Sequence, residues 1–168
     1  MTKVSLIAAL TADGFIGRSI DHLATTWTSR EDVRHFVRLS KELHCIVMGQ
    51  NTYNTIGKGL KDRRNLVYSP EPIDDPTIEV VAEAPEELVK RLTKEGEPNL
   101  LVCGGASIYN LFMQSGLVEE VYLTIEPRLF GQGLSLVKEP LDCELELIDV
   151  QQDSNSVMLH YRIQKPKA

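Results

Sequence analysis

The 168-residue sequence has no long hydrophobic run, no excess of basic residues and only three cysteines. Without a long apolar stretch we expect no membrane-spanning segment, and the chain starts in a strand-like run instead of a signal peptide. A formal net charge of −6 makes nucleic acid and anionic membranes poor partners. No CxxC motif or spaced histidine cluster is present, so no metal site is expected. We therefore expect a cytoplasmic protein that binds a small molecule.

The usual signatures of several enzyme classes are also missing. No GxGxxG follows the first apolar run, and GxSxG, HExxH and Walker patterns are absent. The sequence does contain glycine-rich junctions after apolar runs, at Gly14 and Gly17, at Gly49, and at Gly104 with Gly105. Ligands of open parallel sheets bind outside the carboxyl ends of the strands. Several such junctions together indicate an extended ligand with phosphates, such as a nucleotide.

The junction within residues 100–113 is the clearest of these. An apolar run enters Gly104 and Gly105 and continues with Ile108, Leu111 and Phe112 at helical spacing, which predicts a buried strand leading into a helix. Two glycines let the backbone approach a ligand, and the first amides of the helix are free to bind a phosphate. A Gly-Gly pair is more often only a tight turn, so the rest of the sequence has to decide.

Apolar runs alternate with amphipathic segments along most of the chain. Strands are expected at residues 5–10, 44–48, 65–69, 78–81, 100–103 and 121–125, with helices at 30–43, 49–56, 85–95 and 106–115. This alternation predicts a largely parallel sheet covered on both faces. Residues 145–148 and 157–163 alternate in period two and predict a terminal antiparallel hairpin. We expect one α/β domain over residues 1–168, because no linker or repeat divides the chain.

The segment between Gly17 and Trp27 has no periodicity and is predicted to be a loop. A loop of nine residues inside a compact domain is often a lid or a binding loop. Ser29 followed by Asp32 has the spacing of a capping box at the start of the next helix. From this pattern alone, the simplest role of Asp32 is that of a first-turn carboxylate that stabilises the helix terminus.

Several of these blocks together resemble dihydrofolate reductase. They are the run Ser5–Leu10 with Asp13, Trp27 followed by Asp32 and Phe36, the block Met48–Gly57 with Arg63–Asn65, the Gly-Gly segment with Tyr109, and Tyr122–Thr124. The resemblance covers about residues 4 to 126. Residues 116–121 and 126–133 instead resemble the pyrimidine reductases of riboflavin synthesis, which share the same fold.

The resemblance implies a dihydrofolate-reductase-like fold and an NADPH-dependent enzyme of one-carbon metabolism, which reduces dihydrofolate to tetrahydrofolate. By this resemblance Asp32 promotes protonation of N5 of the pterin, and Trp27, Thr124 and Tyr109 complete the catalytic set. Arg63 matches the family's arginine that pairs with a substrate carboxylate. The substrate groove that the resemblance implies is lined by Ile7, Ala8, Phe36, Ile56, Leu60 and Arg63.

For the cofactor, the resemblance implies binding residues from several junctions: Ala9, Ile16, Gly49, Gln50, Asn51, Thr52, Ser69, Cys103, Gly104, Gly105, Ala106, Ser107 and Ile108. The family often carries arginines where Gln50 and Ser107 stand, and these hold the 2′-phosphate of NADPH. Their replacement leaves NADH open as a cofactor beside NADPH. Family members typically join the two glycines by a cis peptide bond.

Other functions stay open at this point. The C-terminal segments favour a pyrimidine reductase of the riboflavin pathway, or a reductase of another pterin or pyrimidine, as the alternative enzyme. A nucleotide-binding relative without catalysis is the alternative outside enzymes, and the intact set of Asp32, Trp27 and Thr124 argues against it. Pyrimidine reductases commonly dimerise, so both a monomer and a homodimer are compatible with the sequence.

Overall fold

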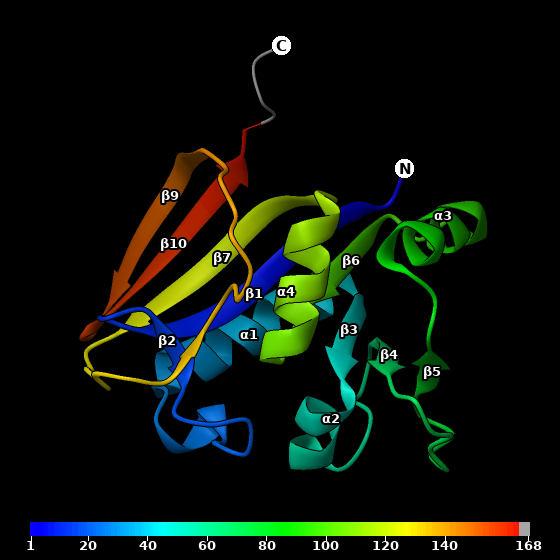
Figure 1. The fold of residues 1–168 in the computed structure, drawn as a ribbon, viewed down its shortest axis with the longest axis horizontal. Coiled ribbons are helices and arrows are strands. Elements are labelled where there is room, and N and C mark those ends of the chain that lie inside the picture. Colours follow the sequence, from blue (N-terminus) through cyan, green and yellow to red (C-terminus); the bar gives the residue numbers. More distant parts are fainter. Residues whose placement is uncertain (165–168) are drawn as a thin grey trace.

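Strands and helices alternate along residues 1–164, which the computed structural model describes (Figure 1). The helices are α1 (Arg30–Leu43), α2 (Gln50–Ile56), α3 (Pro85–Glu95) and α4 (Ala106–Ser115), with a 3-10 turn at Ala24–Thr26. The strands are β1 (Lys3–Thr11), β2 (Phe15–Gly17), β3 (Cys45–Gly49), β4 (Arg64–Tyr68), β5 (Glu79–Val81), β6 (Asn99–Val102), β7 (Val118–Glu126), β8 (Leu134–Ser135), β9 (Leu145–Asp153) and β10 (Ser156–Ile163).

Eight of the strands form one sheet in the order β5-β4-β3-β6-β1-β7-β10-β9. Every neighbouring pair from β5 to β7 is parallel, while β10 runs antiparallel to both β7 and β9. Figure 1 shows this hairpin standing at one end of the sheet, with α4 crossing the middle. The predicted mostly parallel sheet with a C-terminal antiparallel hairpin is confirmed. In the part of the chain that the structure describes, no helix is long and apolar enough to cross a membrane.

The boundaries differ from the prediction in a few places. Strands β1 and β7 are each longer than predicted. They pair with each other in the centre of the sheet, from Val4 opposite Val118 to Thr11 opposite Glu126. His44 ends α1 with a φ of 66° instead of beginning β3, and its N–H donates to the Ser40 carbonyl oxygen. The prediction did not include β8, because a strand of two residues is too short to show a periodic pattern. It pairs with β2, which lies more than a hundred residues before it in the chain.

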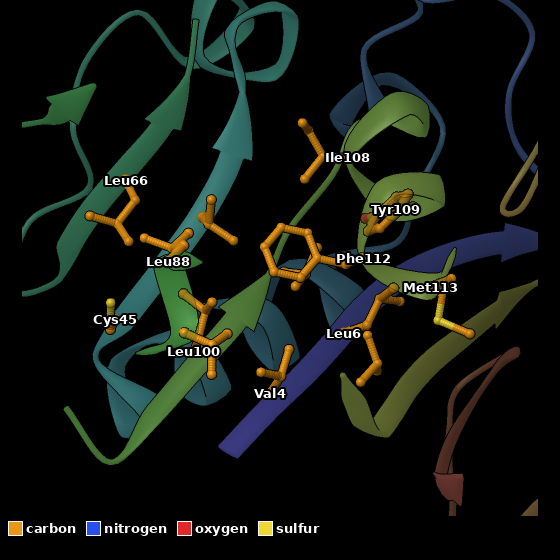
Figure 2. Packing of buried hydrophobic residues seen from close by; sticks show 14 of the residues in the cluster. Val4, Leu6, Cys45, Leu66, Leu88, Leu100, Ile108, Tyr109, Phe112 and Met113 are labelled. Atoms are coloured by element: carbon orange, nitrogen blue, oxygen red, sulfur yellow. The ribbon is translucent and has the colours of Figure 1, made fainter. Parts of the chain in front are cut away.

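Alternating side chains of the central strands divide the core into two clusters, one on each face of the sheet. On β1, Val4, Leu6 and Ala8 pack with α3 and α4, whereas Ile7 packs with α1 and α2. Figure 2 shows Phe112 projecting from α4 into the first cluster, and this ring is fully buried. Because α4 is anchored along its length in this way, its N-terminus is fixed at the carboxyl ends of the parallel strands.

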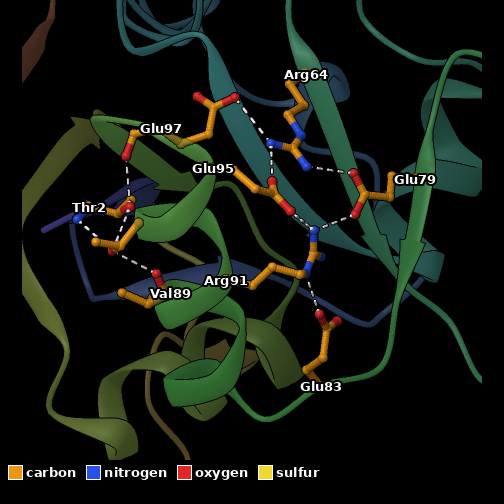
Figure 3. A network of polar contacts seen from close by, with 9 residues as sticks. Thr2, Arg64, Glu79, Glu83, Val89, Arg91, Glu95 and Glu97 are labelled. Carbon is orange, nitrogen blue, oxygen red and sulfur yellow. Dashed lines mark hydrogen bonds and ion pairs between the residues drawn. The ribbon is translucent and has the colours of Figure 1, made fainter.

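Charged side chains tie the β4–β5 edge of the sheet to α3 (Figure 3). The Arg64 guanidinium lies 2.9 Å from Glu79, 2.8 Å from Glu95 and 3.1 Å from Glu97. Arg91 on α3 shares two of these carboxylates, at 2.8 Å from Glu79 and 3.1 Å from Glu95. These pairs form a network in which each guanidinium lies between carboxylates that would otherwise repel one another. An isolated surface ion pair relieves no such repulsion and therefore contributes less to stability.

We predict that Arg64→Met lowers the free energy of unfolding by about 1 kcal/mol, because it leaves Glu97 without a cation and leaves Glu79 and Glu95 with Arg91 alone. Lys41→Met is the control, since Lys41 makes one exposed pair with Asp62 at 3.7 Å and should cost less than about 0.5 kcal/mol. Urea denaturation at low and high salt measures both. High salt should restore part of the free energy of unfolding that Arg64→Met loses. Equal losses of free energy in the two variants would contradict the network role of Arg64.

Candidate active site

A cavity of about 360 Å³ opens where the central parallel strands end. Of the thirteen predicted cofactor residues, Ser69 is the one that does not line it. The Ser69 hydroxyl instead donates to the Glu71 carbonyl oxygen at 2.7 Å. The predicted residues in the cavity wall are Ala9, Ile16, Gly49, Gln50, Asn51, Thr52, Cys103, Gly104, Gly105, Ala106, Ser107 and Ile108, and Tyr109 lies beside them.

Two helix N-termini face this cavity without a side-chain cap. Helix α2 begins after Gly49 and α4 after Gly105, and neither N-cap residue offers a side-chain hydrogen bond. The first helical residues, among them Asn51 and Ser107, line the cavity. The unpaired amides and partial positive charge of two such termini favour an anion with more than one negative group.

Two glycines allow the cavity walls to approach each other. The Gly49 N–H donates to the Gly104 carbonyl oxygen at 2.8 Å, which joins the end of β3 to the turn after β6. A Cβ on Gly49 would lie 2.9 Å from Cγ1 of Ile108, and one on Gly104 would lie 3.0 Å from the Tyr109 ring. Gly104 also has a φ of +109°, which disfavours other residues. The peptide bond between Gly104 and Gly105 is cis, as the resemblance implied.

Tyr109 connects this wall to the central strand. Its hydroxyl donates to the Ile7 carbonyl oxygen at 2.7 Å, and the Cys103 carbonyl oxygen lies at 3.1 Å. Burial raises the pKa of Tyr109 well above its usual value, and the nearby Cys103 thiol and Asp32 carboxyl raise it further. The phenol therefore stays protonated and serves as a hydrogen-bond donor to the central strand.

Asp32 occupies the first turn of α1. Its N–H donates to the Ser29 hydroxyl oxygen at 3.1 Å, so Ser29 is the N-cap that the spacing predicted. Burial raises the pKa of the Asp32 carboxyl, the Thr124 hydroxyl lowers it, the Glu126 carboxylate raises it, and the Thr28 hydroxyl lowers it, with a net increase. A carboxyl group of this kind holds its proton to a higher pH than an ordinary aspartate does.

Two buried polar atoms near α1 have no hydrogen-bond partner within residues 1–164: Nε1 of Trp27 and Oγ1 of Thr124. Trp27 precedes the N-cap Ser29 by two residues, and Thr124 lies on β7 close enough to affect the ionisation of Asp32. Buried donors without partners are uncommon and cost free energy. Such atoms indicate places for a water molecule or for a polar ligand, and the Thr124 hydroxyl is the one that acts on the Asp32 carboxyl.

The predicted substrate residues fall into two groups. Ile7 belongs to the cluster under α1 and α2, and Phe36, Ile56 and Leu60 pack against it as partly buried side chains. Ala8 points to the opposite face of the sheet, into the cluster under α3 and α4. The structure thus brings four of the predicted apolar residues to one side, adjacent to the helix that carries Asp32.

Arg63 reaches the same helix from the loop before β4. Its guanidinium donates to the Ser40 hydroxyl at 2.9 Å, to the Lys61 carbonyl at 2.7 Å and to the Val37 carbonyl at 3.2 Å. All three partners are neutral, and no carboxylate of the described residues pairs with it. Arg63 is therefore a positioned cation whose charge is available to an anionic ligand.

The loop after Gly17 contributes a wall that the residue-by-residue prediction did not include. Ser19, Ile20, His22, Leu23, Ala24 and Leu134 also line the cavity. Phe130 supports this loop, with its ring centroid 5.1 Å from Trp27, 5.7 Å from His22 and 4.1 Å from the Arg18 guanidinium. The apolar residues of a predicted lid could have been nominated from sequence, whereas Leu134 and Phe130 are distant in the chain and gave no signal.

Within residues 1–164, no lysine or arginine lines this cavity. Besides backbone amides, its polar groups are the side chains of Ser19, His22, Gln50, Asn51, Thr52, Thr55, Tyr68, Ser107 and Tyr109. Across residues 1–164, no group of three or more His, Cys, Asp or Glu side chains is arranged to hold a metal ion. The chemistry available here therefore comes from helix termini, neutral polar groups and the neighbouring Asp32 carboxyl.

Comparison with known proteins agrees with this geometry. The family model described as dihydrofolate reductase matches residues 3–131. The chain is 27% identical to a dihydrofolate reductase of Aedes albopictus over 97% of both chains, and 36% identical to dihydrofolate reductase type 3 of Salmonella typhimurium over 76% of this chain and 75% of that one. A solved structure of a Shewanella sp. PV-4 protein assigned to riboflavin biosynthesis superposes with a TM-score of 0.82 at 19% identity, over 98% and 100% of the chains.

We predict that Gly104→Ala destabilises the protein by about 3 kcal/mol, because it adds both backbone strain and a contact with the Tyr109 ring at 3.0 Å. Gly96→Ala is the matched control, since Gly96 has a φ of +82° but nothing within 4 Å of an added Cβ, and should cost about 1 kcal/mol. Chemical denaturation compares the two. If both variants lose the same free energy, the contact with Tyr109 is not a constraint on this turn.

Proposed function

The chain belongs to the dihydrofolate reductase family, and we propose that it reduces 7,8-dihydrofolate to tetrahydrofolate with NADPH. As a member of this family it is an oxidoreductase of the pterin and pyrimidine reductase type. One observation carries the finer proposal: the part-buried Asp32 carboxyl has a raised pKa, and the buried Thr124 hydroxyl acts on it from β7. This is the arrangement that proton delivery to a bound ring nitrogen requires.

The cavity suits a dinucleotide cofactor. The backbone amides at the starts of α2 and α4 would hold its phosphates, and Ala9, Ile16 and Tyr109 would lie beside its nicotinamide end. The missing Cβ atoms of Gly49 and Gly104 support this fit, because side chains there would collide with the opposite wall. When bound, NADPH supplies the hydride, and the chain's contribution is to hold two flat rings together and exclude water.

Asp32 has the central chemical role in this proposal. Its protonated carboxyl is the source of the proton that reaches N5 of the pterin, through a water molecule held at the Nε1 of Trp27. The Thr124 hydroxyl orients the carboxyl and donates or accepts as the ligand requires. The raised pKa means that activity is highest below the pKa of Asp32 and decreases as pH rises through it.

The substrate would lie along the apolar side chains of Ile7, Phe36, Ile56 and Leu60, with its carboxylate at Arg63. The neutral partners of Arg63 support this role, because a guanidinium without a counter-charge pairs well with a planar carboxylate. A ribosyl phosphate would also satisfy Arg63. A pyrimidine reductase is therefore the second candidate, favoured by residues 116–121 and 126–133 and by the fold that the chain shares with the Shewanella protein.

We predict that the protein oxidises NADPH on addition of dihydrofolate and that Asp32→Asn lowers kcat/KM at least about 100-fold, since an amide cannot deliver the proton. Cofactor affinity should change little in this variant. Glu31→Gln is the matched control, because it removes the neighbouring carboxylate of the same helical turn and should leave the rate near wild type. Decay of absorbance of the reduced nicotinamide, followed across pH, measures all three proteins.

Three results would contradict parts of the proposal. Turnover of an aminopyrimidine ribosyl phosphate without turnover of dihydrofolate would favour the pyrimidine reductase. Cofactor binding with no hydride transfer to either substrate would favour a nucleotide-binding relative that has lost catalysis. An Asp32→Asn enzyme as active as wild type would remove the carboxyl from the mechanism.

The absence of arginine and lysine from the cavity wall leads to a prediction about the cofactor. We expect wild-type kcat/KM for NADPH and NADH to lie within about tenfold, because no charged pair acts on a 2′-phosphate. Gln50→Arg should raise the preference for NADPH about tenfold, whereas Gln50→Met, which adds no charge, should not. Assays of both cofactors side by side decide it, and a strong wild-type preference for NADPH would show that another part of the chain binds the phosphate.

A further inference from the structure

Glu126, the last residue of β7, is a buried carboxylate that the mechanism above does not use. The residue is 2% exposed. Its Oε1 accepts from the Ser29 N–H at 2.9 Å and from the Ser29 hydroxyl at 2.7 Å, while its Oε2 accepts from the Ser156 hydroxyl at 2.9 Å. Since all three groups, from two serines, are donors, both oxygens act as acceptors, as in an ionised carboxylate.

This carboxylate has no cationic partner among the described residues. An ionised group buried without a counter-charge is costly unless hydrogen bonds and local dipoles compensate it. Here three hydrogen bonds and the positive end of the 14-residue helix α1 supply that compensation. Ser29 already caps α1 by accepting from the Asp32 N–H, so helix capping alone does not require a second acidic group.

The connection from Glu126 to Asp32 is short. The Ser29 hydroxyl donates to Glu126 at 2.7 Å and accepts from the Asp32 N–H at 3.1 Å, so a single oxygen links the two acidic residues. Thr124 lies two residues before Glu126 on β7 and therefore points to the same face of the sheet. One strand thus presents a hydroxyl and a carboxylate to the same turn of α1.

We propose that Glu126 is a positioning residue for the reduction, which holds the first turn of α1 against β7 through Ser29 and places a buried acidic side chain at the turn that carries Asp32. The catalytic half of this statement rests on the proposed function, because it takes Asp32 as the proton donor. The electrostatic half depends only on the two carboxyl groups and their shared serine. Ser156 extends the contact to β10, so the C-terminal hairpin helps to fix the position of the catalytic turn.

The other charged groups at this end of α1 are arranged differently. Arg34 on α1 lies 3.5 Å from Glu31 and 3.6 Å from Asp153 of β9, and these pairs are at the surface, where solvent screens them. On the cavity side, the Tyr109 phenol is protonated and uncharged. Glu126 is the negative charge that acts on the Asp32 carboxyl from within the protein, and it raises the pKa of that group.

The test is a direct titration of Asp32 in the ligand-free protein by ¹³C NMR of its carboxyl carbon, assigned by comparison with Asp32→Asn. Glu126→Gln keeps the size of the side chain and an oxygen acceptor for Ser29 but removes the charge. We expect the pKa of Asp32 to fall by on the order of one unit in this variant. The pH at which kcat/KM is half lost should move in the same direction by the same amount.

Glu120→Gln is the matched control. Glu120 is also a buried glutamate of β7, but it lies toward the other end of the strand and pairs with Lys3 at 2.7 Å and His160 at 3.1 Å. Its replacement should leave the pKa of Asp32 unchanged. A Glu126→Gln protein in which stability falls but the Asp32 titration stays at its wild-type position would overturn the proposal and leave Glu126 as a purely structural residue.

If the Glu126→Gln variant does not fold, titration of Asp32 in the wild-type protein still tests the proposal. The proposal requires the Asp32 carboxyl to have a pKa above that of an ordinary aspartate. A wild-type Asp32 with an ordinary pKa would overturn it. These titrations need no substrate, so an absence of dihydrofolate turnover would count against the proposed function and not against this coupling.

Discussion

The hydrogen bond from the Gly49 N–H to the Gly104 carbonyl oxygen holds the cofactor side of the site together. It joins the end of β3 to the turn after β6, and it forms because neither residue has a Cβ that would collide with Ile108 or Tyr109. Helices α2 and α4 begin directly after these two turns. The close approach of two backbones therefore places two uncapped helix termini at one cavity, which no single strand-helix junction can achieve.

The substrate side depends on a different kind of constraint, the satisfaction of buried polar groups. Ser29 is fully used, since it caps Asp32 and donates to Glu126, whereas Trp27 Nε1 and Thr124 Oγ1 lack partners among the described residues. A protein interior normally pairs such atoms. Ser29 therefore serves to hold the structure. The Trp27 and Thr124 atoms are instead the ones available to a ligand.

Tyr109 connects the two sides. Its hydroxyl binds the Ile7 carbonyl on the central strand, and its ring limits the space at Gly104. The family's shared fold supports pterin and pyrimidine substrates alike, so the substrate is decided by side chains that reach beyond this framework. Under the proposed function, those side chains are Asp32 and Arg63 for the substrate, and Gln50 and Ser107 for the cofactor.

The sequence by itself determined the order of strands and helices, the Ser29 cap, the glycine junctions and most of the cavity wall, because periodicity, capping and backbone freedom are local properties of the chain. It also singled out Asp32 through the spacing from Trp27, although only as a resemblance. Tertiary structure alone decided that Leu134 and Phe130 support the lid, that Arg63 has only neutral partners, and that Ser69 turns away to Glu71. It also decided the role of Glu126, which looks like an ordinary strand-end acid in the sequence. Its environment comes from Ser29 and Ser156, which lie 97 residues before it and 30 after it, and contacts between residues so far apart leave no pattern in the sequence near any of them.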